Sequence, residues 1–131
     1  MSINYRLTPM NDNISKQAKK GYYAQVVTKG TVDTATLCRD IAAECTLTIA
    51  DMRAAIAALS QSIANRLLNG YNVYLDGIGT FSISAESKLV ESQKDMSSKD
   101  IKVKSINYRS AVSLKEEMKN SSFVKIKEKK N

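Results

Sequence analysis

A chain of 131 residues, 43% hydrophobic and 25% charged, has the size and composition of one globular domain, so wholesale disorder is not expected. The formal net charge of +7 favours a polyanion or an acidic membrane surface as the partner. The chain has no histidine, no glycine-rich phosphate loop and no nucleophile elbow, so we do not expect an enzyme.

Two strands are expected before the first helix. Apolar and polar residues alternate from Ile3 to Leu7, which predicts a short strand that stops at Pro9, the only proline. Residues 10–20 are polar and predict a loop. Residues 21–29, GYYAQVVTK, are rich in aromatic and β-branched side chains and predict a second strand.

Two helices follow. Asp33 or Thr34 can cap a helix over residues 34–44. Thr48 begins a pattern that resembles a capping box, and it opens a helix over residues 49–68 that would be about 30 Å long. The apolar seam of this second helix has helical spacing throughout. Its members are Ile49, Met52, Ile56, Leu59, Ile63 and Leu67.

The second helix is apolar over most of its circumference, because small residues broaden the seam. A helix of that kind must be covered on several sides. One short helix and a small sheet of the same chain offer little cover, so we expect an intertwined homodimer. The alternative is a monomer whose helix is buried under its own sheet. The small residues are Ala54, Ala55, Ala57, Ala58 and Ala64.

The stretch after this helix, NGYNVYLDGIGTFSIS, has three of the five glycines of the chain. Asn69-Gly70 predicts the helix end, and residues 71–75 alternate as a half-buried strand. Asp76-Gly77 predicts a hairpin-type turn, and Gly79 allows a second tight turn or bulge before a strand over residues 80–83.

The last third begins with a polar segment, residues 85–100, which contains neither glycine nor proline and predicts a long hairpin or a disordered loop. A strand returns over residues 101–108, and its change of parity between Val103 and Ile106 predicts a bulge. A helix over residues 111–119 capped by Ser110, a strand over 123–126 and a charged tail over 127–131 complete the pattern.

The sequence does not indicate a metal site, a membrane-spanning segment or a cofactor site. Cys38 and Cys45 lie seven residues apart without a CxxC pair, so buried, reduced thiols are expected rather than a zinc site. The first residues lack the apolar core of a signal peptide, and no apolar run reaches transmembrane length. We therefore expect a cytoplasmic protein without membrane contact, small-molecule substrate, metal or cofactor.

From about Val32 to Lys119, the order helix, helix, strand, glycine corner, strand, arm, strand, helix resembles the HU/IHF family of bacterial histone-like DNA-binding proteins. The closest correspondence is the run Gly77-Ile78-Gly79-Thr80-Phe81. A second is Tyr108-Arg109-Ser110 followed by Leu114-Lys115. The tyrosine-rich N-terminal extension is similar to the longer HU-like variants.

The resemblance implies an α+β fold with two N-terminal helices, a β-saddle, an arm over about 85–100 and a C-terminal helix. It divides the chain into an N-terminal β extension (1–30), an HU-like DNA-binding domain (31–120) and a basic C-terminal segment (121–131). It also implies a nucleoid-associated dimer that binds duplex DNA without sequence specificity and bends or compacts it through phosphate contacts and DNA deformability.

The residues implied for DNA contact lie along and after the arm. Lys102 and Lys104 are two apart, so both are expected on one face of their strand, opposite Ile101 and Val103. By spacing alone, ordinary solvated lysines explain this pattern slightly better, and it is the resemblance that favours DNA contact. The full set is Lys88, Lys94, Lys99, Lys102, Lys104, Arg109, Lys115 and Lys119.

The arm departs from the family pattern. Residues 85–100 contain no proline and no arginine and have a formal charge of −1, so Leu89, Val90 and Met96 are the apolar candidates for a wedge at a base step. These departures keep a second reading open, an HU-like structural or protein-interaction module whose DNA binding is weak or lost. RNA is a third possible partner, and the second subunit is either identical or a paralogue.

Overall fold

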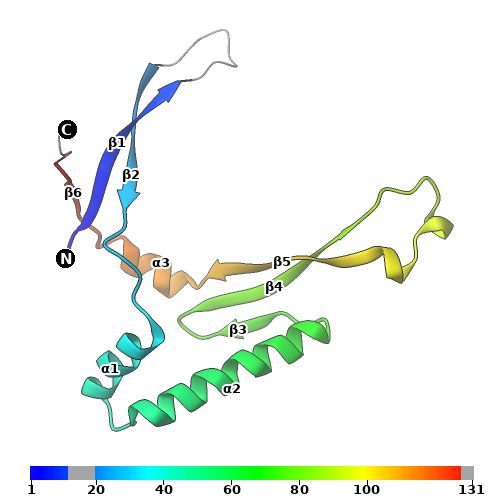
Figure 1. Ribbon diagram of the computed structural model, residues 1–131, viewed down its shortest axis with the longest axis horizontal. Coiled ribbons are helices and arrows are strands. Elements are labelled where there is room, and N and C mark those ends of the chain that lie inside the picture. The colour runs from blue at the N-terminus through cyan, green and yellow to red at the C-terminus, as the bar shows by residue number, and fades with distance from the viewer. Residues whose placement is uncertain (12–19, 128–131) are drawn as a thin grey trace. The chain divides into compact units, whose positions relative to one another are not determined.

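The computed structural model describes residues 1–11 and 20–127 and has an α+β architecture with three α-helices and two small sheets in that part of the chain (Figure 1). Backbone contacts divide the chain into two compact units. The terminal unit comprises Met1–Asp33 and Glu117–Asn131, and the central unit is Thr34–Glu116. The terminal unit is thus assembled from both ends of the chain, with the central unit inserted between them in the sequence.

The terminal unit contains a three-stranded sheet in the order β2-β1-β6. Strands β1 (Ile3–Asn11) and β2 (Lys20–Val27) pair antiparallel, from Asn4 opposite Val27 to Asn11 opposite Lys20. Strand β6 (Phe123–Lys125) pairs parallel with β1 over the first residues of that strand. The tyrosine-rich and C-terminal segments, which are far apart in sequence, therefore form one sheet.

The prediction that β1 ends at Pro9 is wrong. The predicted loop over residues 10–20 is wrong at its first and last residues, which belong to strands. Strand β1 continues through Met10 to Asn11, and β2 already begins at Lys20; residues 12–19 lie outside the described part. Proline lacks a backbone donor and is tolerated on the open side of a strand. Because β6 covers only Ile3–Tyr5, Pro9 lies where β1 has β2 as its sole described neighbour.

The first two helices of the central unit have the expected bounds, α1 at Thr34–Glu44 and α2 at Ile49–Leu68. The Thr48 hydroxyl accepts a hydrogen bond from the Asp51 backbone N–H at 3.1 Å, which caps the start of α2. At its end, Gly70 adopts φ +86°, and the N–H groups of Gly70 and Tyr71 donate to the carbonyls of Leu67 and Arg66 at 3.0 Å. This is the glycine-closed helix end that the sequence predicts.

The central sheet follows in the order β3-β4-β5, all antiparallel, with β3 at Val73–Leu75, β4 at Gly79–Ser87 and β5 at Ile101–Ser110. Helix α3 (Val112–Met118) comes next. The glycine corner joins β3 to β4, and the Ile78 carbonyl there accepts bonds from Tyr108 Oη at 2.7 Å and Ala111 N–H at 2.9 Å. The corner is therefore tied to the end of β5.

Gly79 is required at this corner for two reasons. Its φ of +150° lies in a region that side chains disfavour, and a Cβ there would collide with the Arg109 carbonyl oxygen and the Tyr108 ring. The expected bulge is also present. Ser84 pairs with Ser105 and Ala85 with Val103, which leaves Lys104 as the extra residue of β5.

A single chain leaves much of its apolar surface uncovered. In the described residues, only Cys38, Met52, Leu67 and Ala111 are buried hydrophobic side chains. Ile56 and Leu59, in the middle of the α2 seam, remain 41% and 40% exposed. Met52 and Leu67 of the α2 seam are thus covered within the chain, while the middle of the seam stays partly exposed.

The two cysteines differ. Both are free thiols, but Cys38 is buried and Cys45 is exposed, so the expectation of two buried thiols is wrong for Cys45. Helix α1 ends at Glu44, and Cys45 follows it beyond the packed stripe of the helix.

Candidate nucleic-acid interface

The long antiparallel pair formed by β4 and β5, here called the ribbon, has one polar face. Cross-strand partners point to the same side of a sheet, so the register defines this face. Ser84 and Ser105 meet through their hydroxyl oxygens at 2.8 Å, and the Ser105 hydroxyl donates to Asn107 Oδ1 at 3.1 Å. The polar pairs are Thr80/Arg109, Ser82/Asn107, Ser84/Ser105 and Glu86/Lys102.

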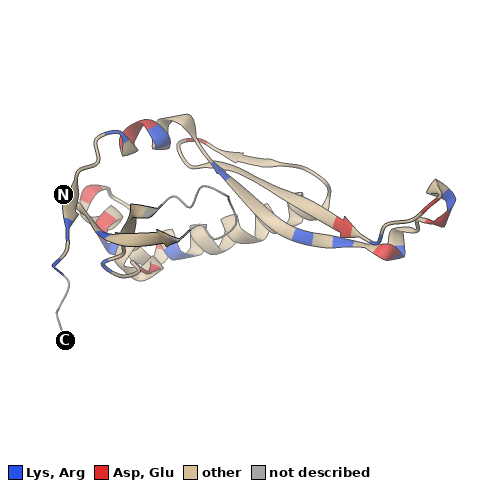
Figure 2. Cartoon of the chain, turned by 90° about the horizontal axis from the view of Figure 1, so that it is seen from above, with Lys and Arg blue, Asp and Glu red and all other residues tan. Residues whose placement is uncertain are grey.

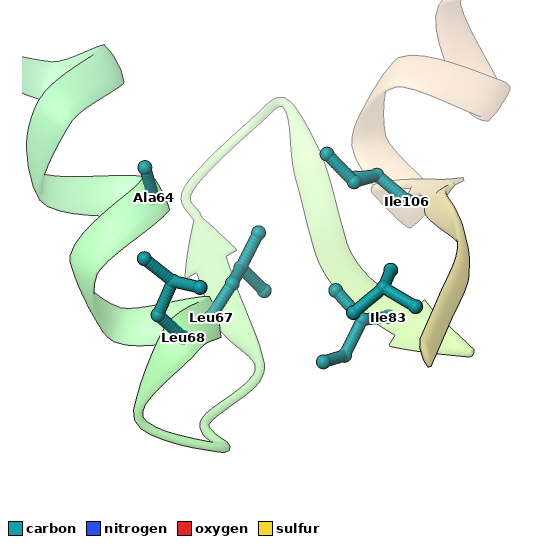
Figure 3. A pocket seen from close by; sticks show the side chains of 6 residues that line it. Ala64, Leu67, Leu68, Ile83 and Ile106 are labelled. Carbon is teal, nitrogen blue, oxygen red and sulfur yellow. The ribbon is translucent and has the colours of Figure 1, made fainter. Parts of the chain in front are cut away.

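The opposite face of the ribbon is apolar. The rings of Phe81 and Tyr108 lie 5.4 Å apart between centroids, and Ile83 pairs with Ile106. Further along, a groove of about 240 Å³ separates this face from the end of α2 (Figure 3). The side chains that line it are all apolar: Ala64, Leu67, Leu68, Ile83, Val103 and Ile106. The apolar face is turned toward α2 of the same unit, so the polar face is the one available to a charged partner.

The eight residues implied for DNA contact spread along the ribbon and beyond it. Lys102 and Arg109 lie on the polar face, whereas Lys104 is the bulge residue and does not follow the simple alternation that we assumed. Lys115 lies on α3, and Lys119 belongs to the terminal unit. The remaining three, Lys88, Lys94 and Lys99, lie in the segment over residues 88–100, here called the tip segment.

Carboxylates accompany two of these lysines, which the sequence did not indicate. Lys102 Nζ lies 3.2 Å from Glu86 Oε1, and Lys88 Nζ lies 3.7 Å from Asp100 Oδ1. Figure 2 shows acidic and basic residues mixed at the far end of the ribbon. The Glu86–Lys102 pair follows from the register alone once the bulge is placed, so the parity change was the signal that could have revealed it.

The tip segment is built from short capped turns. It contains two 3₁₀ turns, Gln93–Asp95 and Ser98–Asp100, each preceded by a serine whose hydroxyl accepts a backbone N–H. Ser97 and Asp100 form a reciprocal capping box. Among the three wedge candidates, Leu89 is fully exposed at 101%, while Val90 and Met96 are half-buried.

In the described residues, no group of three or more histidine, cysteine, aspartate or glutamate side chains could hold a metal ion. The helices in that same part of the chain are too short or too polar to cross a membrane.

Two helices, a glycine corner and a β-ribbon that leads into a third helix define an HU-like domain. The family model described as "HU domain fused to wHTH, Ig, or Glycine-rich motif" matches residues 1–125, and the chain belongs to that family. The HU-like part of the resemblance is thereby confirmed. The match begins at residue 1, so it includes the strands of the terminal unit as well as the central unit.

A solved structure has the same fold. It is a protein from Bacteroides vulgatus ATCC 8482, provisionally described as a bacterial DNA-binding protein, and it superposes with a TM-score of 0.69 at 17% identity. The comparison covers 95% of this chain and 48% of that one, so this chain spans about half the length of its structural neighbour. No curated protein matches the sequence.

Proposed function

We propose that this chain binds duplex DNA without reading its sequence and bends or compacts it as a homodimer. The observation that carries the proposal is the ribbon, whose polar face presents Lys102, Arg109 and a row of hydroxyl and amide groups. Such groups suit phosphate and sugar contacts, which position a protein on DNA without selecting bases. The HU domain of the family and the description of the Bacteroides vulgatus protein support the same conclusion.

The dimer follows from the uncovered α2 seam. Partly exposed apolar side chains in the middle of a 20-residue helix are removed from water when a second copy packs against them. We expect Leu59→Asp to give a monomer in size-exclusion chromatography with light scattering, because a charge at this contact cannot be paired. Gln61→Asp, on the opposite side of α2, should leave the dimer intact. A monomeric wild type would refute the dimer.

The binding test compares two double variants of equal charge. Replacing Lys102 and Arg109 with glutamine should lower the affinity for a random duplex by about 10-fold and make its salt dependence shallower. Replacing Arg39 and Arg53, which lie on α1 and α2, should change neither quantity by more than about twofold. Wild-type protein that binds no duplex even at low salt would refute the proposed function.

A second candidate, an HU-like protein-interaction module, is favoured by one observation. The central unit has ten basic and nine acidic residues, a formal charge of only +1. If the Lys102/Arg109 variant binds duplex as well as wild type, the polar face of the ribbon is not the DNA site. If wild type itself binds no duplex at low salt, this second candidate is preferred. Competition between duplex DNA and structured RNA in the same assay separates the two polymers.

Bending is tested separately from affinity. Leu89 is the exposed apolar side chain of the tip segment and the candidate wedge. We expect Leu89→Ala to reduce the end-to-end approach of a doubly labelled duplex, measured by energy transfer, with an affinity loss of less than about 10-fold. Unchanged energy transfer would show that Leu89 does not enter a base step.

A further inference from the structure

The net charge of the chain is divided very unevenly between the two units. The terminal unit has ten basic and four acidic residues, a formal charge of +6, against +1 for the central unit. Nearly all of the positive excess therefore lies outside the part of the chain that contains the glycine corner, the ribbon and helix α2. A polyanion is attracted by this positive excess, irrespective of which unit contains the HU-like motifs.

The strands of the terminal sheet contain no acidic residue. Their sequences are INYRLTPMN, KGYYAQVV and FVK, and Arg6 and Lys125 on them are exposed. Lys29 and Lys127, just beyond two of these strands, are exposed as well. In the ribbon, by contrast, Lys102 is paired with Glu86, so part of its charge is already compensated within the protein.

These four cations gather toward one end of the terminal sheet. Lys29 Nζ donates to the Ser2 carbonyl at 2.8 Å, which holds it at the start of β1. Lys125 pairs with Tyr5 in the parallel register, and the Ile126 N–H donates to the Tyr5 carbonyl at 3.0 Å, so Lys127 follows directly. Arg6 is the next residue of β1. Neighbouring strands lie about 4.8 Å apart, and DNA has one phosphate per about 3.4 Å along each strand, so cations that share a face at this end of the sheet can meet more than one phosphate.

Aromatic side chains accompany Lys125 on one sheet face, and Arg6 lies on the opposite face. The register places Ile3, Tyr5, Tyr22, Val26 and Phe123 on the face that also holds Lys125. The Tyr5 and Phe123 rings meet edge to face at 6.5 Å, which fixes β6 against β1. Lys125 therefore projects from an ordered sheet rather than from a loose tail, and a charge held in place loses less entropy when it binds.

We propose that the terminal sheet is a second nucleic-acid contact, which supplies most of the phosphate-binding free energy while the central unit supplies the shape. Its partner is the phosphate backbone of the same DNA duplex. This inference rests on the proposed function, because it assigns the electrostatic part of duplex binding to a different part of the chain. It differs from the expectation that the lysines and the arginine of the ribbon provide most of the affinity for DNA.

The test compares two variants that each lose four positive charges. The sheet variant replaces Arg6, Lys29, Lys125 and Lys127 with glutamine, and the ribbon variant replaces Lys99, Lys102, Lys104 and Arg109, three of which lie on β5. Fluorescence anisotropy with a random labelled duplex is measured over a salt series. We expect the sheet variant to lose about 100-fold in affinity at low salt. Its slope of log affinity against log salt concentration should become shallower by about 2 to 4. The ribbon variant should lose about 10-fold in affinity or less.

A double variant is the control in case the fourfold sheet variant does not fold. Lys125→Gln with Lys127→Gln keeps the bonds of Arg6 to Gln25 and of Lys29 to Ser2, and should give about half of the slope change. If the sheet variants bind like wild type while the ribbon variant loses affinity, the inference is wrong and the proposed function stands. If wild type binds no duplex at any salt concentration, the proposed function itself fails.

Discussion

The two three-stranded sheets of this protein are built and charged in opposite ways. The central sheet β3-β4-β5 is a meander of consecutive strands, and its ribbon pairs Lys102 with Glu86. The terminal sheet β2-β1-β6 joins the two ends of the chain, and its strands lack acidic residues. The motifs that resemble HU proteins therefore lie in the central unit, whereas most of the positive net charge lies in the terminal unit.

The largest expected effect tests whether the two sheets are independent. Gly79→Ala should cost about 3 kcal/mol or more, because the new Cβ overlaps the Arg109 backbone at a φ that alanine disfavours. Hydrogen exchange should then become faster across β3, β4 and β5 while β1 and β2 stay protected.

The control lies in the other sheet. A methyl group added at Gly21 would have no neighbouring atom within 4 Å, and the φ of this residue is not positive. Gly21→Ala should therefore be neutral or stabilise the protein by up to about 1 kcal/mol. Equal destabilisation by both alanines would contradict the specific role assigned to Gly79.

The second effect weakens the terminal sheet instead. Tyr5→Ala removes the edge-to-face contact with Phe123 that joins β1 to β6, and should cost about 2 kcal/mol. Exchange should rise at β6 and the start of β1, with the central sheet unaffected. Tyr22→Ala is the matched control, since this ring is 74% exposed and its loss should cost less than about 1 kcal/mol. If the central sheet also loses protection, the two units unfold together.

The smallest effect concerns the charge balance of the ribbon. Glu86→Gln frees Lys102 and removes a carboxylate from the polar face, so duplex affinity should rise by about 3- to 5-fold at low salt. Glu44→Gln, at the end of α1, changes the net charge equally and should have less than about a twofold effect. A gain that is equal for both variants would show that only the net charge matters.

Local rules account for what the sequence predicted well. The ends of α2 follow from Thr48, whose hydroxyl caps the first turn, and from Gly70, which adopts the left-handed conformation. The bulge at Lys104 left its mark as a change of parity in the apolar pattern. Each of these features depends on residues that are neighbours in the chain, and for that reason residue type alone indicates them.

Long-range pairing accounts for what the sequence missed. Pro9 marked a strand end in the sequence, but β6 pairs only with the first residues of β1 and leaves the proline side open. The sequence did not indicate that the two ends of the chain form one sheet, because Ile3 and Phe123 meet across almost the whole chain. The pairing of Glu86 with Lys102 likewise required the strand register.

The parallel pairing of β6 with β1 also sets an order of events during synthesis. Strands β1 and β2 leave the ribosome before the central unit, but an isolated two-stranded hairpin is marginally stable in water. The whole of Thr34–Glu116 emerges before Phe123–Lys125 can supply the third strand. The terminal sheet is therefore completed after the central unit, and a nascent chain can form the helices and ribbon of the central unit before the terminal sheet exists.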